Sequence, residues 1–496
     1  MLAATILGSS MAFIDGTVVN VALPALQNAL HASISDAQWV VESYALMLAA
    51  LLLVGGSLGD IFGRRKVYIV GVAVFAAASA WCGLAQNIDM LIWARSVQGL
   101  GAALLVPGSL ALITASFPEN TRGQAIGTWS GFSAITTAIG PVIGGWLIEH
   151  STWRWAFFLN LPLALMVIVL CTRVPESRNM EASPHLDWPG ALLATLGLGG
   201  ITYALIEWPA RAHHQLSIVA AAAGLGVIAL AALVAVERWS SAPMVSLKLF
   251  RSRNFTGANL LTLFLYAALG GLLFFFPMDL IQIQRYSATQ AGAAFLPFVA
   301  IMFGLSRWAG GLVARYGSRF PLTVGPLVAA CGIALFALAP QNGNYWTAFF
   351  PAVTVMGLGM AISVAPLTTT VMNAVKDSES GLTSGINNAV SRLASLLAVA
   401  AFGAVLVAVF NRSLDRQLSH IALSPNVRAQ VDADRPRLAA AHNSDPRVQR
   451  AIAESFLSGY RTVIWTATSL AILSATTAWV FIEPRTVLSS EQGQER

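Results

Sequence analysis

The chain of 496 residues is 56% hydrophobic and only 10% charged, with a mean hydropathy of +0.67. A soluble domain carries about 25% charged residues, so this composition excludes a soluble protein and predicts that the lipid bilayer is the solvent of the chain. The net charge of +6 does not indicate nucleic-acid binding, because the basic residues fall in short loops between apolar runs.

Apolar runs of the length that a helix needs to cross a bilayer recur along the chain. The first begins almost at Met1 with no basic residue ahead of it, and Pro24 follows it rather than a cleavage site of small residues. We therefore expect no cleaved signal peptide, and a true start upstream of Met1. Fourteen spans of an all-α integral membrane protein are predicted, near residues 2–24, 37–57, 67–86, 89–116, 125–148, 155–172, 189–207, 215–236, 256–280, 288–312, 321–339, 346–372, 383–410 and 462–482.

Arginine and lysine positions predict the orientation of these spans, because cytoplasmic loops are enriched in both residues. With both termini in the cytoplasm, the short outer loops hold three: Arg154, Arg211 and Arg285. The inner loops and the C-terminal tail then hold fifteen, namely Arg64, Arg65, Lys66, Arg122, Arg173, Arg178, Arg238, Lys248, Arg251, Arg253, Arg315, Arg319, Lys376, Arg485 and Arg496. The bias predicts a multi-pass protein of the bacterial cytoplasmic (inner) membrane with both termini inside. The polar segment near 411–461 is expected to be a long extracytoplasmic loop with short helices.

The segment GSLGDIFGRRK joins the second and third predicted spans. It resembles the loop signature of the major facilitator superfamily at seven positions: Gly56, Leu58, Asp60, Gly63, Arg64, Arg65 and Lys66. The resemblance implies a gating loop, in which Gly63 allows a tight turn. Asp60 would pair with an arginine or a helix N-terminus in one transport state and release it in the other. The alternative is that these charges only set the topology.

A weak internal repeat indicates two related halves. Residues 57–65, SLGDIFGRR, align with residues 311–319, GLVARYGSR. Parallel repeats of this kind are typical of transporters, with the substrate site between the halves near the bilayer midplane. The resemblance to the superfamily therefore implies a six-helix half in 1–180, two additional spans in 181–245 and a second six-helix half in 246–496.

Several further motifs resemble the fourteen-span drug:proton antiporter branch of that superfamily. AFIDGTVVNVALP in the first span matches the branch signature at Asp15, Thr17, Asn20, Ala22, Leu23 and Pro24, and QWVVESYAL places Glu42 in the second span. RSVQGLGAA resembles the fourth-span motif, with Arg95 and Gln98 on one helix face. WRWAFFLNLP and SLKLFRSRNF are also similar to this branch.

Three of these residues are candidates for proton coupling. At 1.5 Å per residue, Asp15 lies roughly 15 Å, Glu42 roughly 7 Å and Arg95 roughly 10 Å below the outer ends of their spans. Burial favours a neutral carboxyl and a nearby arginine favours the carboxylate, so access and ligand occupancy could switch protonation. The alternatives are a structural role for Asp15, an interfacial position for Glu42 and a structural ion pair for Arg95.

The fifth predicted span carries GTWSGFSAITTAIGPVIGG, which resembles the antiporter motif of the superfamily at Gly127, Gly140, Pro141, Gly144 and Gly145. The resemblance implies an exporter. Its glycines would allow close approach of another helix and seal the inner end of the bundle. The alternative is an ordinary packing face of small residues.

Polar residues at helical spacing in the thirteenth span predict one wall of a substrate cavity, because such a stripe is costly against lipid. They are Ser384, Asn387, Asn388, Ser391, Arg392 and Ser395, and Asn20 and Gln98 are expected to contribute from the other half. The alternative is polar contact between helices. Asp279, near the outer end of the ninth span, is expected to be solvated.

Together these features predict a proton-coupled secondary transporter that exports amphipathic small molecules, such as drugs, dyes and toxic metabolites. An importer, or an exporter of one endogenous metabolite, is the alternative. No nucleophile constellation or metal cluster in the sequence indicates an enzyme. The expected partners are a small-molecule substrate, protons and the lipid bilayer, with no nucleic acid. We expect no cofactor other than the proton gradient, and a monomer, with a periplasmic adaptor left open.

Overall fold

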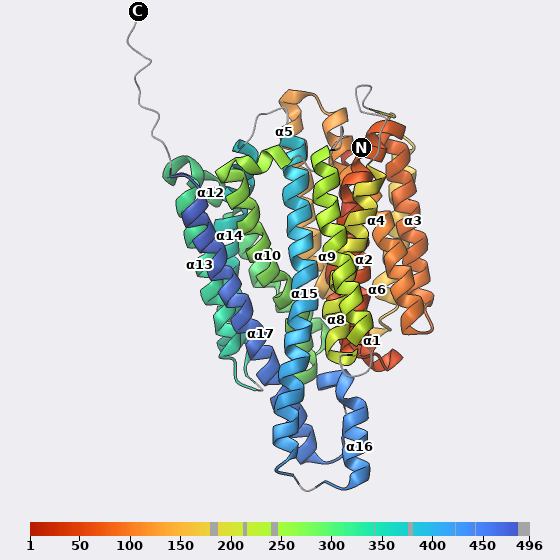
Figure 1. Cartoon of the computed structure of the whole chain (residues 1–496). Helices are drawn as coiled ribbons and strands as arrows, with labels where there is room; N and C mark the ends of the chain where they lie inside the picture. The colour runs from red at the N-terminus through yellow and green to blue at the C-terminus, as the bar shows by residue number, and fades with distance from the viewer. Residues whose placement is uncertain are drawn as a thin grey trace, which may run out of the picture.

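The structure is a computed structural model in which long helices run side by side as a bundle (Figure 1). It describes residues 1–178, 187–211, 216–239, 247–341, 343–374, 380–421, 423–441 and 443–484. Within these ranges the chain is helical and contains no strand.

The N-terminal helices form one packed group. They are α1 (Leu2–Leu30), α2 (Ile34–Phe62), α3 (Arg64–Leu84), α4 (Ile88–Ser116), α5 (Glu119–His150), α6 (Trp155–Phe158) and α7 (Asn160–Cys171). A capping box of Ser33 and Asp36 begins α2, and Gly63 ends it with a φ of 109°, a conformation that glycine adopts without steric cost. The turn at Gly63 and the N-terminus lie at the same end of the bundle (Figure 1), which we call the α2–α3 end.

The C-terminal helices form a second packed group. They are η1 (Leu247–Arg251), α10 (Arg253–Met278), η2 (Asp279–Ile283), α11 (Ala288–Ala293), α12 (Leu296–Tyr316), α13 (Arg319–Ala337), η3 (Tyr345–Phe349), α14 (Phe350–Asn373), α15 (Ser380–Leu418) and α17 (Pro446–Phe481). Gly317 ends α12 with a φ of 73°, so the two turns related by the predicted repeat, at Gly63 and Gly317, share a positive φ.

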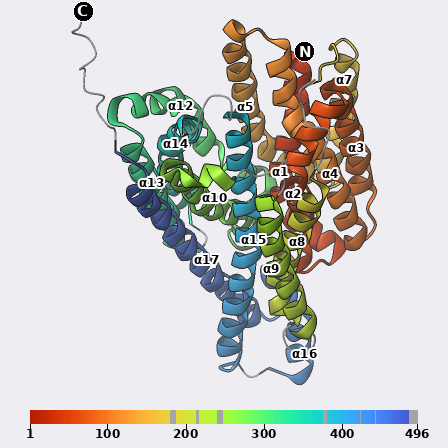
Figure 2. The same ribbon diagram turned by 45° about the horizontal axis from the view of Figure 1, so that its top comes forward.

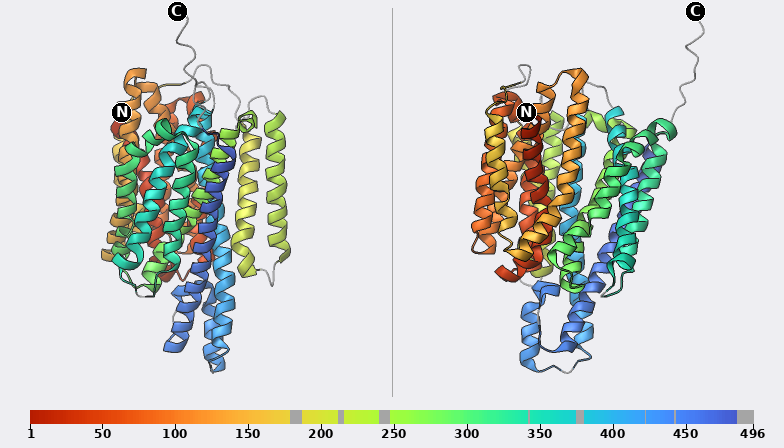
Figure 3. Two further views of the ribbon diagram at one scale, coloured as in Figure 1. Left: turned by 90° about the vertical axis from the view of Figure 1, so that its left-hand side faces the viewer. Right: turned by 180° about the vertical axis from the view of Figure 1, so that it is seen from behind.

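Two helices that come between these groups in the sequence lie at one side of the bundle and pack mainly on each other (Figure 3). They are α8 (Trp188–Arg211) and α9 (Leu216–Trp239). Of the two, α8 also contacts α2 and α15, one helix from each group. These two helices lie at the positions of the seventh and eighth predicted spans.

Twelve helices in the described part of the chain are long and apolar enough to cross a membrane. They match twelve of the predicted spans in position. The fifth and sixth predicted spans correspond to α5 and to the shorter segment Trp155–Cys171, which are outside that set of twelve. A multi-pass all-α membrane protein is therefore confirmed, and the count of fourteen stays a prediction.

The segment predicted as a long loop near 411–461 is mostly a continuation of two membrane helices. The helices α15 and α17 are 39 and 36 residues long, whereas about 20 residues suffice to cross a bilayer. Together with α16 (Pro425–Asp434) and η5 (Arg435–Ala440) they project beyond the bundle (Figure 2). Apolar side chains hold this extension together, which is why it is helical: Leu414, Leu418, Val431, Val448, Ile452 and Phe456 are buried. We call this the α16 end.

The two groups contact each other mainly toward the α16 end. The hydrogen bonds found between them join Gln27 to Gln282 at 3.0 Å, Gln38 to the carbonyl of Val399 at 2.7 Å, and Thr289 to Glu149 at 2.6 Å. Figure 3 shows the groups diverging toward the α2–α3 end. The structure is therefore a conformation closed at the α16 end.

Candidate functional site

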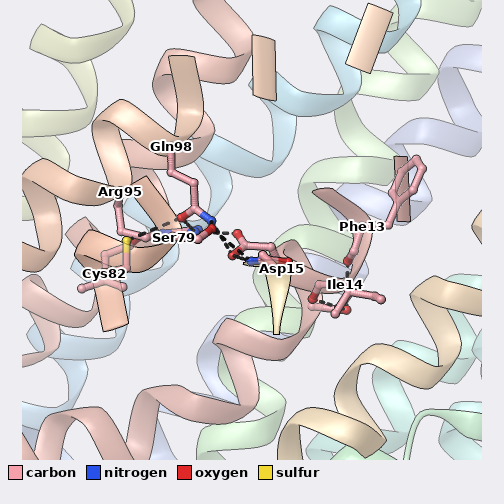
Figure 4. A network of polar contacts seen from close by, with 10 residues as sticks. Phe13, Ile14, Asp15, Ser79, Cys82, Arg95 and Gln98 are labelled. Carbon is pink, nitrogen blue, oxygen red and sulfur yellow. Dashed lines mark hydrogen bonds and ion pairs between the residues drawn. The ribbon is translucent and has the colours of Figure 1, made fainter. Parts of the chain in front are cut away.

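A buried ion pair joins the first and fourth helices. The Arg95 Nη1 donates to Asp15 Oδ2 at 2.5 Å and to Gln98 Oε1 at 2.6 Å (Figure 4). The Gln98 Nε2 donates to Asp15 Oδ1 and to Ser79 Oγ, both at 2.8 Å. All four side chains are buried. The structure thus brings two of the three proton-coupling candidates, Asp15 and Arg95, into contact, and their role in coupling stays a prediction.

Further contacts fix this network in place. Asn160, in the first turn of α7, donates to Asp15 Oδ1 and to Ser79 Oγ, both at 3.2 Å. The Arg95 Nε donates to the backbone carbonyl of Val40 at 2.9 Å. With three donors on its carboxylate and a paired guanidinium, Asp15 is built to hold a negative charge in this conformation.

Glu42 lies outside this network. It is buried, its Oε2 has no hydrogen-bond partner, and no contact joins it to Asp15 or Arg95 among the described residues. The direction of the Glu42 side chain follows from Gln38 and Leu46, which lie one helical turn before and after it on the same face of α2. Gln38 donates to Val399 of α15, and Leu46 packs with Leu198 of α8 and Leu396 of α15. The expected cluster of two carboxylates and one arginine therefore reduces to Asp15 and Arg95, with Glu42 on the face of α2 toward α8 and α15.

A cavity of about 180 Å³ lies between the two groups, next to the ion pair but separated from it. Its lining comes from α1, α2, α5 and α15: Ala12, Phe13, Gly16, Thr17, Tyr44, Thr137 and Arg392. The Tyr44 ring is one wall of the cavity and also lies 4.2 Å from the Arg95 guanidinium carbon. Figure 4 shows Asp15 directed toward Arg95 and Gln98, away from Phe13. The cavity therefore contacts the opposite face of α1 from Asp15.

The residues predicted to line the substrate cavity are not all found at one place. Arg392 lines the cavity just described, and Gln98 belongs to the buried network instead. Asn387 donates to Thr262 at 2.8 Å and to Asn259 at 3.1 Å on α10, which is the alternative of polar contact between helices. Ser391 donates to the backbone carbonyl of Asn388, and Asn20 is partly buried with an unpartnered Oδ1.

Comparison with known protein families identifies the family of this chain. The sequence model of the Major Facilitator Superfamily matches residues 5–399. The chain belongs to the major facilitator superfamily. It is 33% identical to the Multidrug resistance protein Stp of Mycobacterium tuberculosis (strain CDC 1551 / Oshkosh), over 97% of this chain and 90% of that protein. It is 34% identical, over the same two shares, to the Puromycin resistance protein pur8 of Streptomyces alboniger.

A third relative, the Tetracenomycin C resistance and export protein of Streptomyces glaucescens, is 30% identical over 96% of this chain and 90% of that protein. Solved structures agree on the fold. A bacterial homologue of the human lysosomal transporter Spinster, inward-facing and unoccupied, superposes with a TM-score of 0.68 at 19% identity over 96% of both chains. The inward-open xylose transporter XylE from E. coli gives 0.59 at 15% identity, over 98% of this chain and 97% of that one. Superfamily membership makes this chain a membrane transporter and not an enzyme.

The superfamily loop at the α2–α3 end has its charges paired locally. Asp60 accepts from Arg64 Nε at 2.8 Å, one turn along the chain, and both side chains are partly exposed. The contact to another element comes from Glu176, whose Oε1 accepts from the backbone N–H of Arg65 at 3.0 Å. The Arg65 side chain also donates to the carbonyl of Val174 at 2.8 Å. Among the residues that the structure describes, the acid of the predicted latch therefore forms its hydrogen bond and ion pair with Arg64 and none with the C-terminal group.

Three glycines of the superfamily's antiporter motif, Gly140, Gly144 and Gly145, make close helix contacts toward the α16 end. Helix α5 runs from the α2–α3 end to His150 at the α16 end, so residues 140–145 fall in its last turns. Added side chains at Gly140 and Gly144 would meet Thr17 and Val18 of α1, and one at Gly145 would meet the backbone of Ala288 in α11. The Pro141 carbonyl faces Gly292 of α11 in the same way. These glycines therefore pack closely at the α16 end. In the orientation predicted from the loop charges this is the outer end, so the predicted seal at the inner end and the predicted orientation do not agree.

Gly127, the remaining residue of this motif, has open space around it, since an added Cβ would meet nothing within 4 Å. Gly56, in the superfamily loop, is also loosely packed: within the described part of the chain, an added Cβ would meet the Pro107 side chain at 3.7 Å and nothing closer. These two positions do not make the close helix contacts seen at Gly140, Gly144 and Gly145.

Sequence reasoning missed four residues of interest. Tyr44 and Asn160 fall inside motifs that resemble the antiporter branch, so a residue-by-residue reading of those motifs could have selected them. Ser79 carries no sequence signal, because one serine in an apolar helix is common. Asp279 was expected to be solvated, and this is wrong, because its side chain is 1% exposed.

Proposed function

We propose that this chain is a proton-coupled exporter of amphipathic small molecules across the bacterial cytoplasmic membrane. The relatives named above are resistance and export proteins, which supports export of antibiotic-like compounds. The observation that carries the proposal is the buried Asp15–Arg95 pair beside a central cavity. The proton gradient would supply the energy. The transporter would work as a monomer, because the ion pair and the cavity both lie within one chain.

Protonation of Asp15 would change the shape of the cavity through α1 and Tyr44, because both line the cavity and both contact the ion pair. A proton on the carboxyl removes the charge that pairs with Arg95. The guanidinium would then keep the Gln98 oxygen, the Val40 carbonyl and the rings of Tyr44 and Phe157. Phe13 and Thr17 line the cavity on the other face of the same helix. Substrate and proton would therefore compete through movement of α1 and of Tyr44 rather than by direct contact.

The cavity lining suits neutral or anionic parts of a substrate better than cationic ones. Arg392 is the charged residue among its lining side chains, and the Asp15 carboxylate is turned away from it. A cationic group would meet a like charge there, which is unfavourable in a site of low dielectric. We therefore expect aromatic or polar compounds without a fixed positive charge among the best substrates.

The orientation follows from the charge bias of the loops. The basic turn Arg64–Lys66 would lie in the cytoplasm, so the α2–α3 end would face the cell interior and the extension at the α16 end the outside. The conformation described here would then be the inward-facing one. Asp60 would latch the opposite conformation, in which the α2–α3 end is closed.

Transport in membrane vesicles of opposite orientation tests the direction of flux. In inside-out vesicles with an acidified lumen, a lipophilic antibiotic or dye should accumulate in the lumen, and its addition should partly dissipate the pH gradient. Asp15→Asn should abolish both signals. Asp89→Asn is the matched control, because it makes the same chemical change at an exposed residue in the first turn of α4.

Accumulation in right-side-out vesicles under an inward proton gradient would instead identify an importer. Equal transport by the wild type and by Asp15→Asn at equal expression would remove Asp15 from the mechanism.

A further inference from the structure

A second acid is buried in the C-terminal group, far from the ion pair in sequence. Asp279 begins the π-helical turn η2, two residues after Pro277 in the last turn of α10. Single π-turns often occur at functional sites. The Asp279 side chain is 1% exposed and lies within a predicted span, and ionisable residues at such positions are expensive and usually functional.

The surroundings of Asp279 do not support a negative charge. Its Oδ1 has no hydrogen-bond partner, and its Oδ2 has one long contact, to Gln284 Nε2 at 3.5 Å. Two further polar atoms nearby are also buried without partners, the Tyr460 hydroxyl of α17 and the Gln284 Oε1. An ionised carboxylate here would be both dehydrated and unpaired, which is strongly unfavourable.

The charged groups around Asp279 leave it without an ion pair. Helices α10, α11, α17 and η5 pack against η2. From α17, Arg461 is exposed and close enough to act on Asp279, but forms no ion pair with it among the described residues. From η5, Arg435 and Arg437 pair with aspartates of the extension. The sequence of α11 holds no titratable residue, and α10 holds only Arg253 at its far end and Tyr266 at mid-helix. Tyr286, in the segment after η2, donates to Gly343.

Asp15 provides the contrast. It has Arg95, Gln98 and Asn160 as donors and is suited to the ionised form, whereas Asp279 is suited to the neutral, protonated form. Asp15 and Asp279 therefore have surroundings that favour opposite charge states, the two states that a proton carrier must visit.

A polar cavity adjoins the same turn. It has a volume of about 510 Å³ and lies at the α16 end, between the α10–α11 segment and the start of α17. Gln282 and Ile283 line it from the π-turn itself, and Arg450 and Glu454 line it from α17. Water in this cavity would be one turn of backbone away from Asp279, on the side of the bundle where the extension projects.

We propose that Asp279 is a second proton-binding residue of the transport cycle, which exchanges its proton with the α16 end of the bundle. This rests on the proton coupling proposed above for Asp15. Asp279 would hold its proton in the conformation described here and release or reload it when the contacts between the two groups at the α16 end open. The transporter would then move more than one proton in each cycle.

Infrared spectroscopy of the purified protein tests the proton on Asp279 without any transport. The carbonyl stretch of a protonated carboxyl is resolved from that of a carboxylate and shifts in deuterated water. In a Glu42→Gln background, which removes the other buried acid without a partner on its Oε2, a protonated-carboxyl band should be present at neutral pH. Asp279→Asn should remove this band, Asp279→Glu should retain a shifted band, and Asp15→Asn should leave it unchanged. A protonated-carboxyl signal that Asp279→Asn does not diminish would overturn the proposal.

The coupling ratio tests the role of that proton in transport. In proteoliposomes, Asp279→Asn should lower the number of protons moved per substrate by the one proton that a carboxyl carries, and Asp279→Glu should restore the wild-type ratio. An unchanged ratio in Asp279→Asn would overturn the role of this residue in coupling. If no variant and no wild type shows proton-coupled transport, the proposed function fails, and the infrared result alone decides whether Asp279 binds a proton.

Discussion

Arg95 and Asp15 form an ion pair at 2.5 Å in which both side chains are withdrawn from solvent. Breaking a buried pair by removing one partner costs about 3–5 kcal/mol, since the remaining charge is left uncompensated. Yet the pair must open for Asp15 to accept a proton. While the pair is formed, Gln98 and Asn160 donate hydrogen bonds to the Asp15 carboxylate, and Ser79 accepts hydrogen bonds from both of them.

The pair should show strong coupling in a double-mutant cycle. Arg95→Leu should lower the free energy of unfolding by about 3–5 kcal/mol and reduce yield in detergent. Adding Asp15→Asn to it should recover part of that loss, because no unpaired charge then remains buried. Thermal unfolding of purified single and double variants measures both effects. Purely additive losses would show that the two side chains do not act as a pair.

The glycine contacts at the α16 end should decide which conformations are accessible. A leucine at Gly145 would collide with the backbone of Ala288, so Gly145→Leu should open the α16 end, deplete the inward-facing conformation and reduce efflux. Labelling of a cysteine at Thr289 by an impermeant reagent should then rise. Gly127→Leu is the matched control, because the space around Gly127 is open. Equal labelling in both variants would argue against this closing role.

Asp60 should matter for transport and not for stability. Its partner Arg64 is one turn away and both side chains are partly exposed, so Asp60→Asn should change the free energy of unfolding by less than about 1 kcal/mol. If Asp60 latches the opposite conformation, a coupling of about 1–3 kcal/mol corresponds to a roughly 5–150-fold loss of efflux. Drug susceptibility of cells with equal expression measures this loss. Wild-type resistance in Asp60→Asn would leave the loop as a topology signal only.

Arg392 should select substrates by charge. Arg392→Gln removes the charged group of the central cavity, so anionic compounds should lose about 1.5–3 kcal/mol of binding free energy, the value of a hydrogen bond to a charged group. Neutral compounds of similar size should lose less, and cationic ones should bind better. Dye competition with purified protein measures all three classes. The same loss for every class would indicate a structural role.

Local patterns in the sequence predicted the features that are set within one helix or turn, such as where a helix ends and how deep a residue lies in its span. The positive φ at Gly63 follows from a glycine between two apolar runs, and the meeting of Asp15 with Arg95 follows from their similar depth. Depth alone does not fix the face of a helix, however, so Glu42 was grouped with residues from which it is turned away. The burial of Asp279 depends on α17, which is nearly 180 residues away in sequence. The contact of Gly145 with α11 could not be predicted either, because the sequence does not indicate which helix packs against it.

Substrate-induced proton release from the purified protein tests most directly whether Asp15 carries the coupling proton. Substrate should be added to wild type, Asp15→Asn, Glu42→Gln and Asp89→Asn in weakly buffered detergent solution across a pH series. Glu42 lies outside the ion-pair network, so Glu42→Gln and the control Asp89→Asn should release protons like the wild type. Asp15→Asn should release fewer, by the one proton that its carboxyl would carry, although it should still bind the substrate. Undiminished release from Asp15→Asn would contradict the account.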